Sequence, residues 1–136
     1  MTKNVSIYEG FKDSTSEKQM DLDIFLDNIR SGEYEDLIHK VRTADTEEEK
    51  RKYKSKLPSI TTSGTFASRS KGGLIRHSSF ICIDIDDCDA NEVKAQICTD
   101  DYIYAAFTSC SGHGVAAIYK INPDKHDEAF LGLSQY

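Results

Sequence analysis

Signals for export and for membrane insertion are missing from this 136-residue sequence. The N-terminus, Met1-Thr-Lys-Asn-Val5, has no apolar run of signal-peptide length. No stretch approaches the roughly 18 consecutive apolar residues from which a membrane span is recognised. We therefore expect a cytoplasmic protein.

Cysteines at metal-binding spacing are also missing. The four cysteines, Cys82, Cys88, Cys98 and Cys110, include no Cys-x-x-Cys pair, and each lies in or beside an apolar segment. This pattern disfavours disulfides and a zinc site. It indicates small buried side chains in a reducing compartment.

The sequence has no excess of positive charge. Lysine and arginine total 17 residues against 23 acidic residues, which gives a formal net charge of −6. The molecule as a whole therefore does not attract nucleic acid, and any site for a polyanion must be a local basic patch. The composition, 38% apolar and 29% charged, is that of an ordinary globular protein.

A chain of this length holds one domain with a real hydrophobic core, so we expect residues 1–136 to form a single domain. After a short first strand, residues 1–57 are expected to be mainly helical. Apolar residues recur at helical spacing at Leu22, Phe25, Leu26 and Ile29, and again at Leu37, Ile38 and Val41. A third helix is predicted from Thr46, which forms a capping-box pattern with Glu49.

From residue 58 onward the sequence predicts strands as well as helices. Residues 60–67 are β-branched and extended around Gly64, and residues 69–77 are expected to form an exposed loop. The next predicted elements are a strand at 80–86, a helix at 90–98, a strand at 102–109, a turn at 111–114, a strand at 115–121 and a helix from 122. This order is typical of a split βαβ sheet, ferredoxin- or RRM-like, and the predicted fold class is α+β. We expect two sheet neighbours to be joined by the helix crossover and two by the glycine turn.

The last predicted helix still has apolar residues at helical spacing, Ala129, Phe130 and Leu133, when the chain ends at Tyr136. A further strand would be expected to follow that helix. We therefore expect the chain to be truncated at its C-terminus.

The most informative segment is residues 80–89, with the sequence Phe-Ile-Cys-Ile-Asp-Ile-Asp-Asp-Cys-Asp. On a strand, Ile81, Ile83 and Ile85 point to one face, and Asp84 and Asp86 point to the other. The Cα atoms of the two aspartates are then about 6.5–7 Å apart. Their carboxylates can converge on one divalent ion or bridge two ions, and oxygen ligands favour Mg²⁺ or Mn²⁺.

A polar strand end that runs into a turn is the alternative explanation for these aspartates. Asp87 and Asp89 fit that explanation, with Asp89 as the N-cap of the next helix. Aspartate is depleted within strands, which favours the metal interpretation for Asp84 and Asp86.

A turn with two glycines, Ser111-Gly112-His113-Gly114, separates the last two predicted strands. Backbone N–H groups in such a turn are available to a phosphate. An ordinary hairpin turn is the default explanation for the glycines. His113 could be a phosphate ligand or a general base, or it could simply be exposed.

Arg69, Lys71 and Arg76 form the one local cationic cluster in the sequence outside the mixed-charge helical region. These residues could bind a nucleoside triphosphate or template phosphates. The alternative is that they keep an exposed loop soluble.

Three motifs occur in an order that resembles a known group of proteins. They are Pro-Ser-Ile-Thr-Thr-Ser-Gly-Thr-Phe at 58–66, Phe-Ile-Cys-Ile-Asp-Ile-Asp at 80–86, and Ala-Ala-Phe-Thr-Ser-Cys-Ser-Gly-His-Gly at 105–114. The chain looks like the archaeo-eukaryotic primase-polymerase superfamily. More narrowly, it resembles the N-terminal domain of VirE-type primase-helicase proteins of mobile elements, over about residues 55–136.

The resemblance implies a role in DNA replication, namely template-directed primer synthesis with two divalent metal ions. It implies that Asp84 and Asp86 hold the catalytic Mg²⁺ or Mn²⁺. It also implies that the glycine turn binds the incoming nucleotide through Ser111, Gly112 and Gly114, and we include His113 in this set.

The implied partners are a nucleoside triphosphate, a single-stranded nucleic-acid template and a helicase or other C-terminal domain of the parent protein. Arg69, Lys71 and Arg76 are the residues that we expect to contact the template.

The sequence departs from the family pattern at two points. Ala116 stands where the family has a basic residue, two positions after the second glycine, and the third metal carboxylate would lie on a later strand. We therefore expect the isolated chain to be inactive as a polymerase. A non-catalytic module that binds nucleic acid or docks to a partner stays open, as does a structural domain without a ligand.

Overall fold

The computed structural model describes residues 3–9, 18–69, 71–122 and 124. These residues form a mixed α+β fold with four α-helices and several small antiparallel sheets, as the sequence predicts. The chain divides into two compact units, residues 1–78 and residues 79–136. The prediction of a single domain stays a prediction. No helix in the described ranges is long and apolar enough to cross a membrane.

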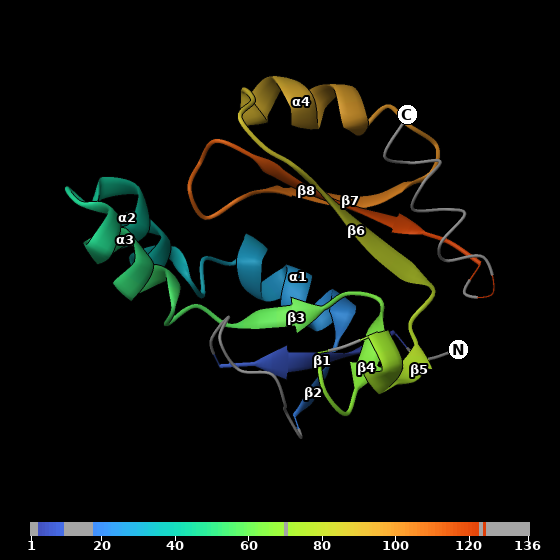
Figure 1. The fold of residues 1–136 in the computed structure, drawn as a ribbon. Coiled ribbons are helices and arrows are strands. Elements are labelled where there is room, and N and C mark those ends of the chain that lie inside the picture. The colour runs from blue at the N-terminus through green and yellow to red at the C-terminus, as the bar shows by residue number, and fades with distance from the viewer. Residues whose placement is uncertain (1–2, 10–17, 70, 123, 125–136) are drawn as a thin grey trace. The chain divides into compact units, whose positions relative to one another are not determined.

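The first unit contains two sheets and three helices (Figure 1). One antiparallel sheet has the strand order β2-β1-β3, and the other pairs β4 with β5. The elements are β1 (Asn4–Tyr8), β2 (Gln19–Asp21), α1 (Leu22–Arg30), α2 (Glu35–Thr43), α3 (Glu47–Lys54), β3 (Ser59–Thr61), β4 (Gly64–Phe66), the 3₁₀ turn η1 (Lys71–Gly73) and β5 (Leu74–His77).

Local features of the sequence determine two helix ends in this unit. The Thr46 hydroxyl accepts a hydrogen bond from the Glu49 N–H at 3.1 Å, as the capping-box pattern predicts. Gly32 follows α1 with φ +85°, a conformation that glycine adopts at low cost.

The prediction of a loop over residues 69–77 is wrong in part. This segment contains η1 and β5, and β5 pairs antiparallel with β4. Three of the four β5 residues are exposed, with Ile75 at 66%. The strand therefore has no alternation of buried and exposed residues from which it could be predicted.

The second unit is a three-stranded antiparallel sheet with one helix. Its elements are β6 (Phe80–Ile85), α4 (Ala90–Ile97), β7 (Ile103–Thr108) and β8 (Val115–Lys120). The strand order is β6-β8-β7, and β8 is antiparallel to both neighbours. Strands β6 and β7 therefore run parallel, are joined by α4 and are separated by β8, which is a split βαβ connection. The expectation that the helix joins two sheet neighbours is wrong, because β8 lies between them.

One face of this sheet packs against α4 (Figure 1). The centre of the packed face is Ile81, Ala117 and Tyr119, whose side chains are at most 7% exposed. Partly buried isoleucines complete the cluster, namely Ile83, Ile97, Ile103 and Ile121. Full burial of one such side chain contributes about 1.5–3 kcal/mol, so this face anchors β6 firmly. Most of the final helix predicted from residue 122 lies outside the described residues, which include only 122 and 124 of that segment.

Candidate functional site

Asp84 and Asp86 lie at the C-terminal end of β6. Asp84 is in the strand opposite Ala116 of β8, and Asp86 directly follows the strand. Both aspartates are exposed. In the part of the chain that the structure describes, no lysine or arginine forms an ion pair with either carboxylate. The two acidic groups therefore face solvent, and within the described ranges no cationic side chain neutralises them.

The alternation predicted over residues 80–86 agrees with the packing at residues 81–84, and the strand ends at Ile85, one residue before Asp86. Ile81 and Ile83 belong to the cluster on the α4 face, opposite Tyr119 and Ala117. Cys82 and Asp84 share the other face, where the Cys82 thiol donates a hydrogen bond to Asp84 Oδ1 at 3.9 Å. The strand thus turns its isoleucines inward and presents its first aspartate on the opposite side.

The Cys82 thiol is strongly affected by this position. Burial raises the pKa of Cys82 to about 12, and the negative charge of Asp84 and the hydrogen bond to it act in the same direction. The thiol therefore stays protonated at neutral pH and acts as a hydrogen-bond donor. Strand alternation places Cys82 on the same face as Asp84, and this is the signal from which the contact could have been sought.

The glycine turn between β7 and β8 is closed by its own hydrogen bonds. The Ser109 N–H donates to the Gly114 carbonyl at 2.9 Å, and the Gly112 N–H donates to the Ser109 carbonyl at 3.0 Å. The Ser109 and Ser111 hydroxyls lie 3.1 Å apart, and the His113 N–H donates to Ser111 Oγ at 3.3 Å. Gly112 has φ +85°, which favours glycine at this position.

These contacts change the expected chemistry of the turn. The N–H groups of Gly112 and His113 are used inside the turn, whereas the sequence led us to expect them to face a phosphate. The His113 side chain is exposed, and the Ser111 hydroxyl is at the partly exposed centre of the turn. Side chains, rather than these two N–H groups, are therefore the groups that the turn can offer to an anion.

The turn lies directly against the end of β6. A Cβ atom placed on Gly114 would be 2.7 Å from the Ile85 carbonyl oxygen and 3.5 Å from Asp86 Oδ1. The Cys88 N–H donates to the His113 carbonyl at 3.0 Å. The structure thus brings Asp86 and the glycine turn together, and Gly114 is the residue whose missing side chain permits the close approach.

The predicted basic residues lie in the first unit. The Arg69 guanidinium packs over the Tyr8 ring at 3.7 Å and donates a hydrogen bond to the Ser59 hydroxyl. Lys71 begins the η1 turn, and Arg76 is an exposed residue of β5. Arg69 therefore has a structural contact that the sequence did not predict, whereas Arg76 presents its side chain at the surface.

The donor set at Asp84 and Asp86 fits a magnesium-type ion held largely by non-protein oxygens. Among the described residues, no group of three or more His, Cys, Asp and Glu side chains comes together at one point. Magnesium is commonly bound by one or two carboxylates, with water and substrate phosphates in the other positions. Two exposed carboxylates satisfy that requirement.

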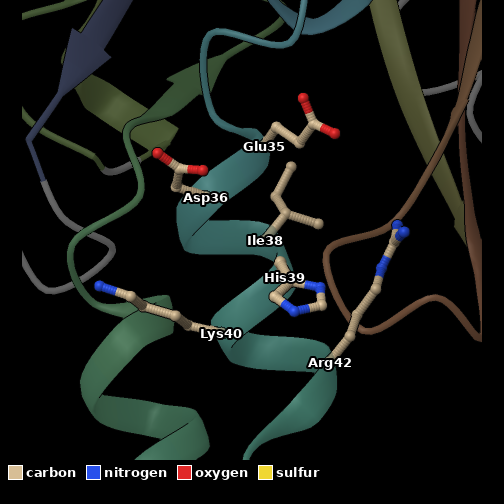
Figure 2. A pocket seen from close by; sticks show the side chains of 6 residues that line it. All are labelled: Glu35, Asp36, Ile38, His39, Lys40 and Arg42. Atoms are coloured by element: carbon tan, nitrogen blue, oxygen red, sulfur yellow. The ribbon is translucent and has the colours of Figure 1, made fainter.

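A separate hollow lies along α2 in the first unit (Figure 2). The residues that line it are all on this helix, namely Glu35, Asp36, Ile38, His39, Lys40 and Arg42. Figure 2 shows Asp36 and Lys40 on one side of the helix and His39 and Arg42 on the other. The acidic side chains belong to the first turn of α2 and the basic ones to its last turn, the usual arrangement on a solvated helix. None of the predicted site residues lines the hollow.

The chain belongs to the BT4734-like N-terminal domain family, whose model matches residues 52–133. This range contains both aspartates, the glycine turn and the three basic residues. Comparisons with curated proteins and with solved structures find no match.

Proposed function

We propose that this domain is a primase-type nucleotidyl-transfer domain, related to the N-terminal domain of VirE-type primase-helicase proteins of mobile elements. The observation that carries the proposal is the juxtaposition of the two aspartates at the end of β6 with the glycine turn. Asp86 Oδ1 would lie 3.5 Å from a Cβ atom on Gly114, which is the distance between direct neighbours. The split βαβ order of β6, α4, β7 and β8 agrees with a primase-polymerase-like core, which we include in the proposal.

Under this proposal, Asp84 and Asp86 bind Mg²⁺ or Mn²⁺. Bound divalent ions would supply charge neutralisation at the phosphates of a nucleotide. The carboxylates are suited to this role because they are exposed and have no ion pair with a lysine or arginine in the described ranges. Their mutual repulsion also makes a cation favourable at this point.

The glycine turn binds the nucleoside triphosphate in this proposal. The Ser111 hydroxyl and the exposed His113 ring provide polar contacts, and Gly112 and Gly114 let the backbone follow its tight path beside Asp86. Arg69, Lys71 and Arg76 bind the single-stranded template, and Arg76 is exposed on β5. A helicase or other C-terminal domain of a longer parent protein would act on the same nucleic acid.

Mn²⁺ binding to three single variants tests the proposal. Asp84→Asn and Asp86→Asn each remove one carboxylate ligand and retain the shape of the side chain. Asp101→Asn makes the same charge change at an exposed residue before β7, at the opposite end of the sheet. We expect the first two variants to lose about tenfold or more in Mn²⁺ affinity, because even groups that only orient a metal ligand contribute about 10–100-fold. We expect Asp101→Asn to bind like the wild type. Equal affinity in all four proteins would show that the metal assignment is wrong.

A non-catalytic nucleic-acid-binding module is the second candidate, and the identity of residue 116 favours it. Ala116 occupies the position of the family's basic residue, and it is 7% exposed opposite Asp84. This candidate predicts binding of a single-stranded oligonucleotide that weakens with salt and is unchanged by EDTA. Arg76→Ala would weaken that binding, and Asp84→Asn would not.

A further inference from the structure

The Cys82 thiol is adjacent to the proposed metal ligand Asp84 and points to the same side of β6. Its Sγ atom is 3.9 Å from Asp84 Oδ1, within the range of a thiol hydrogen bond. The side chain is partly buried, and the two residues directly opposite in β8 are Ile118 and Ala116. These apolar neighbours provide no competing acceptor for the thiol hydrogen.

The contact engages only one of the two oxygens of Asp84. Among the residues that the structure describes, the Cys82 thiol is the donor found at this carboxylate, and no ion pair reaches it. Oδ2 is therefore left for a cation, while the hydrogen bond to Oδ1 restricts rotation of the carboxylate. An exposed aspartate without such a contact would lose more side-chain freedom when it binds an ion.

We infer that Cys82 is a positioning residue for Asp84: its thiol orients the carboxylate for a divalent cation without touching the ion. This inference rests on the proposed metal-binding function of Asp84. Donors of this kind orient metal ligands in many proteins, and their loss typically lowers metal affinity about 10–100-fold. A thiol is a weak donor, so we expect the smaller loss of about threefold to tenfold here.

The test is Mn²⁺ affinity in a series of Cys82 variants, each checked for an unchanged circular dichroism spectrum. Cys82→Ser keeps a donor at the position, Cys82→Ala removes it, and Cys82→Val removes it while filling the space. Cys98→Ala is the matched control, because Cys98 is exposed at the C-cap of α4. We expect Cys82→Ala and Cys82→Val to bind Mn²⁺ about threefold to tenfold more weakly, and Cys82→Ser and Cys98→Ala to bind like the wild type.

A double-variant comparison separates positioning from a general structural effect. If Cys82 acts through Asp84, Cys82→Ala should change Mn²⁺ affinity by less than about twofold in the Asp84→Asn background. Full Mn²⁺ affinity in both Cys82→Ala and Cys82→Val overturns the inference and leaves the metal site intact. Equal weakening in all three Cys82 variants also overturns it, because a retained donor should rescue binding. A wild-type chain that does not bind Mn²⁺ contradicts the proposed function itself, and the inference falls with it.

Discussion

At the scale of single residues, Asp84 and Asp86 are exceptional because of where they lie. Most of the other acidic residues that the structure describes in the second unit are in turns or on α4, where water and helix geometry accommodate a negative charge. Asp84, by contrast, is inside a strand whose other face is the hydrophobic core. Aspartate is unfavourable in strands, and a second carboxylate two positions later adds repulsion. A cation-binding function would explain why one carboxylate stands inside this strand and a second directly after it.

Gly114 is the residue whose replacement should disturb the candidate site most directly. A Cβ atom there would be 2.7 Å from the Ile85 carbonyl oxygen, so Gly114→Ala must displace backbone. We expect a loss of about 1–3 kcal/mol in the free energy of unfolding, the usual cost of overpacking. Gly72→Ala is the control, because nothing lies within 4 Å of a Cβ atom at Gly72. Urea unfolding of both variants measures the difference, and equal midpoints would contradict the close approach.

Cys82 should make stability depend on pH in the alkaline range. Its pKa is raised from the ordinary value of 9.0 to about 12 in the folded protein. At a pH below the ordinary pKa, the Cys82 thiol is protonated in both the folded and the unfolded chain. Its contribution to the free energy of unfolding is then fully present. As pH rises through the interval between the two values, the unfolded chain releases the proton first, so the stabilisation is progressively lost.

The measurement is the difference in unfolding midpoint between the wild type and Cys82→Ser at pH 8 and at about pH 10.5. Other titrating groups are the same in both proteins and cancel from the difference. We expect the wild type to lose more stability than the variant over this range. A difference that stays constant would show that the thiol is not buried as described.

At the scale of secondary-structure elements, the split βαβ connection is what assembles the candidate site. Strands β6 and β7 run parallel, so their C-terminal ends lie at the same edge of the sheet, where β8 begins. The aspartates lie at the C-terminal end of β6 and the glycine turn follows β7, and both therefore meet at this edge. Residues 25 or more positions apart in the sequence become neighbours through topology, as the contact between Cys88 and His113 illustrates.

The sequence was a good guide to elements with a clear local signal. Three examples are the apolar alternation in β6, the helical spacing in α1 and the capping box at Thr46. Each of these signals depends only on residues close together in the sequence. The strand β5 has no such signal, because it is exposed and is defined by its pairing with β4. The three-residue strand β2 is likewise defined by its partner β1.

In the candidate site, too, only the features with a local sequence signal could be predicted. Alternation along one strand predicted that Asp84 lies on the face opposite to the isoleucines, and the two glycines predicted the position of the turn. The internal use of the Gly112 and His113 N–H groups could not be predicted, because it depends on how Ser109 and Ser111 fold back on the turn. The contact of Arg69 with Tyr8 joins residues 61 positions apart and has no local signal.

The N-cap of α4 offers a test of how the segment after the aspartates is held. The Asp89 carboxylate accepts a hydrogen bond from the Glu92 N–H at 3.1 Å, as the sequence predicts. Asp89→Ala should lower the free energy of unfolding by about 1 kcal/mol, the typical value for loss of a cap. Asp89→Asn retains the acceptor and should be close to wild type in thermal melts. A wild-type melting temperature for Asp89→Ala would contradict the capping role.

At the scale of the whole molecule, the net charge of −6 disfavours general attraction to nucleic acid. Function in replication would then depend on local features, namely a cation at Asp84 and Asp86 and the basic side chains of the first unit. A divalent ion at Asp84 and Asp86 would also neutralise the local negative charge where a nucleotide phosphate must approach.

Ligand-dependent stability tests the proposed function on the intact chain. A ligand that binds only the folded state stabilises it by about 2.7 kcal/mol when its free concentration is a hundred times the Kd. We expect Mn²⁺ with a nucleoside triphosphate to raise the melting temperature of the wild type, and Mn²⁺ to give a smaller rise without the nucleotide. Asp101→Asn should respond fully and Asp86→Asn weakly. A rise of equal size in Asp86→Asn would place the ligand elsewhere.

The most direct measurement is the anomalous scattering of Mn²⁺ in crystals soaked with the metal and a nucleoside triphosphate. We predict an anomalous peak within about 2.0–2.6 Å of carboxylate oxygens of both Asp84 and Asp86, on the side of the glycine turn. No peak at these two aspartates, in crystals whose nucleotide is visible elsewhere, would contradict the proposed metal site.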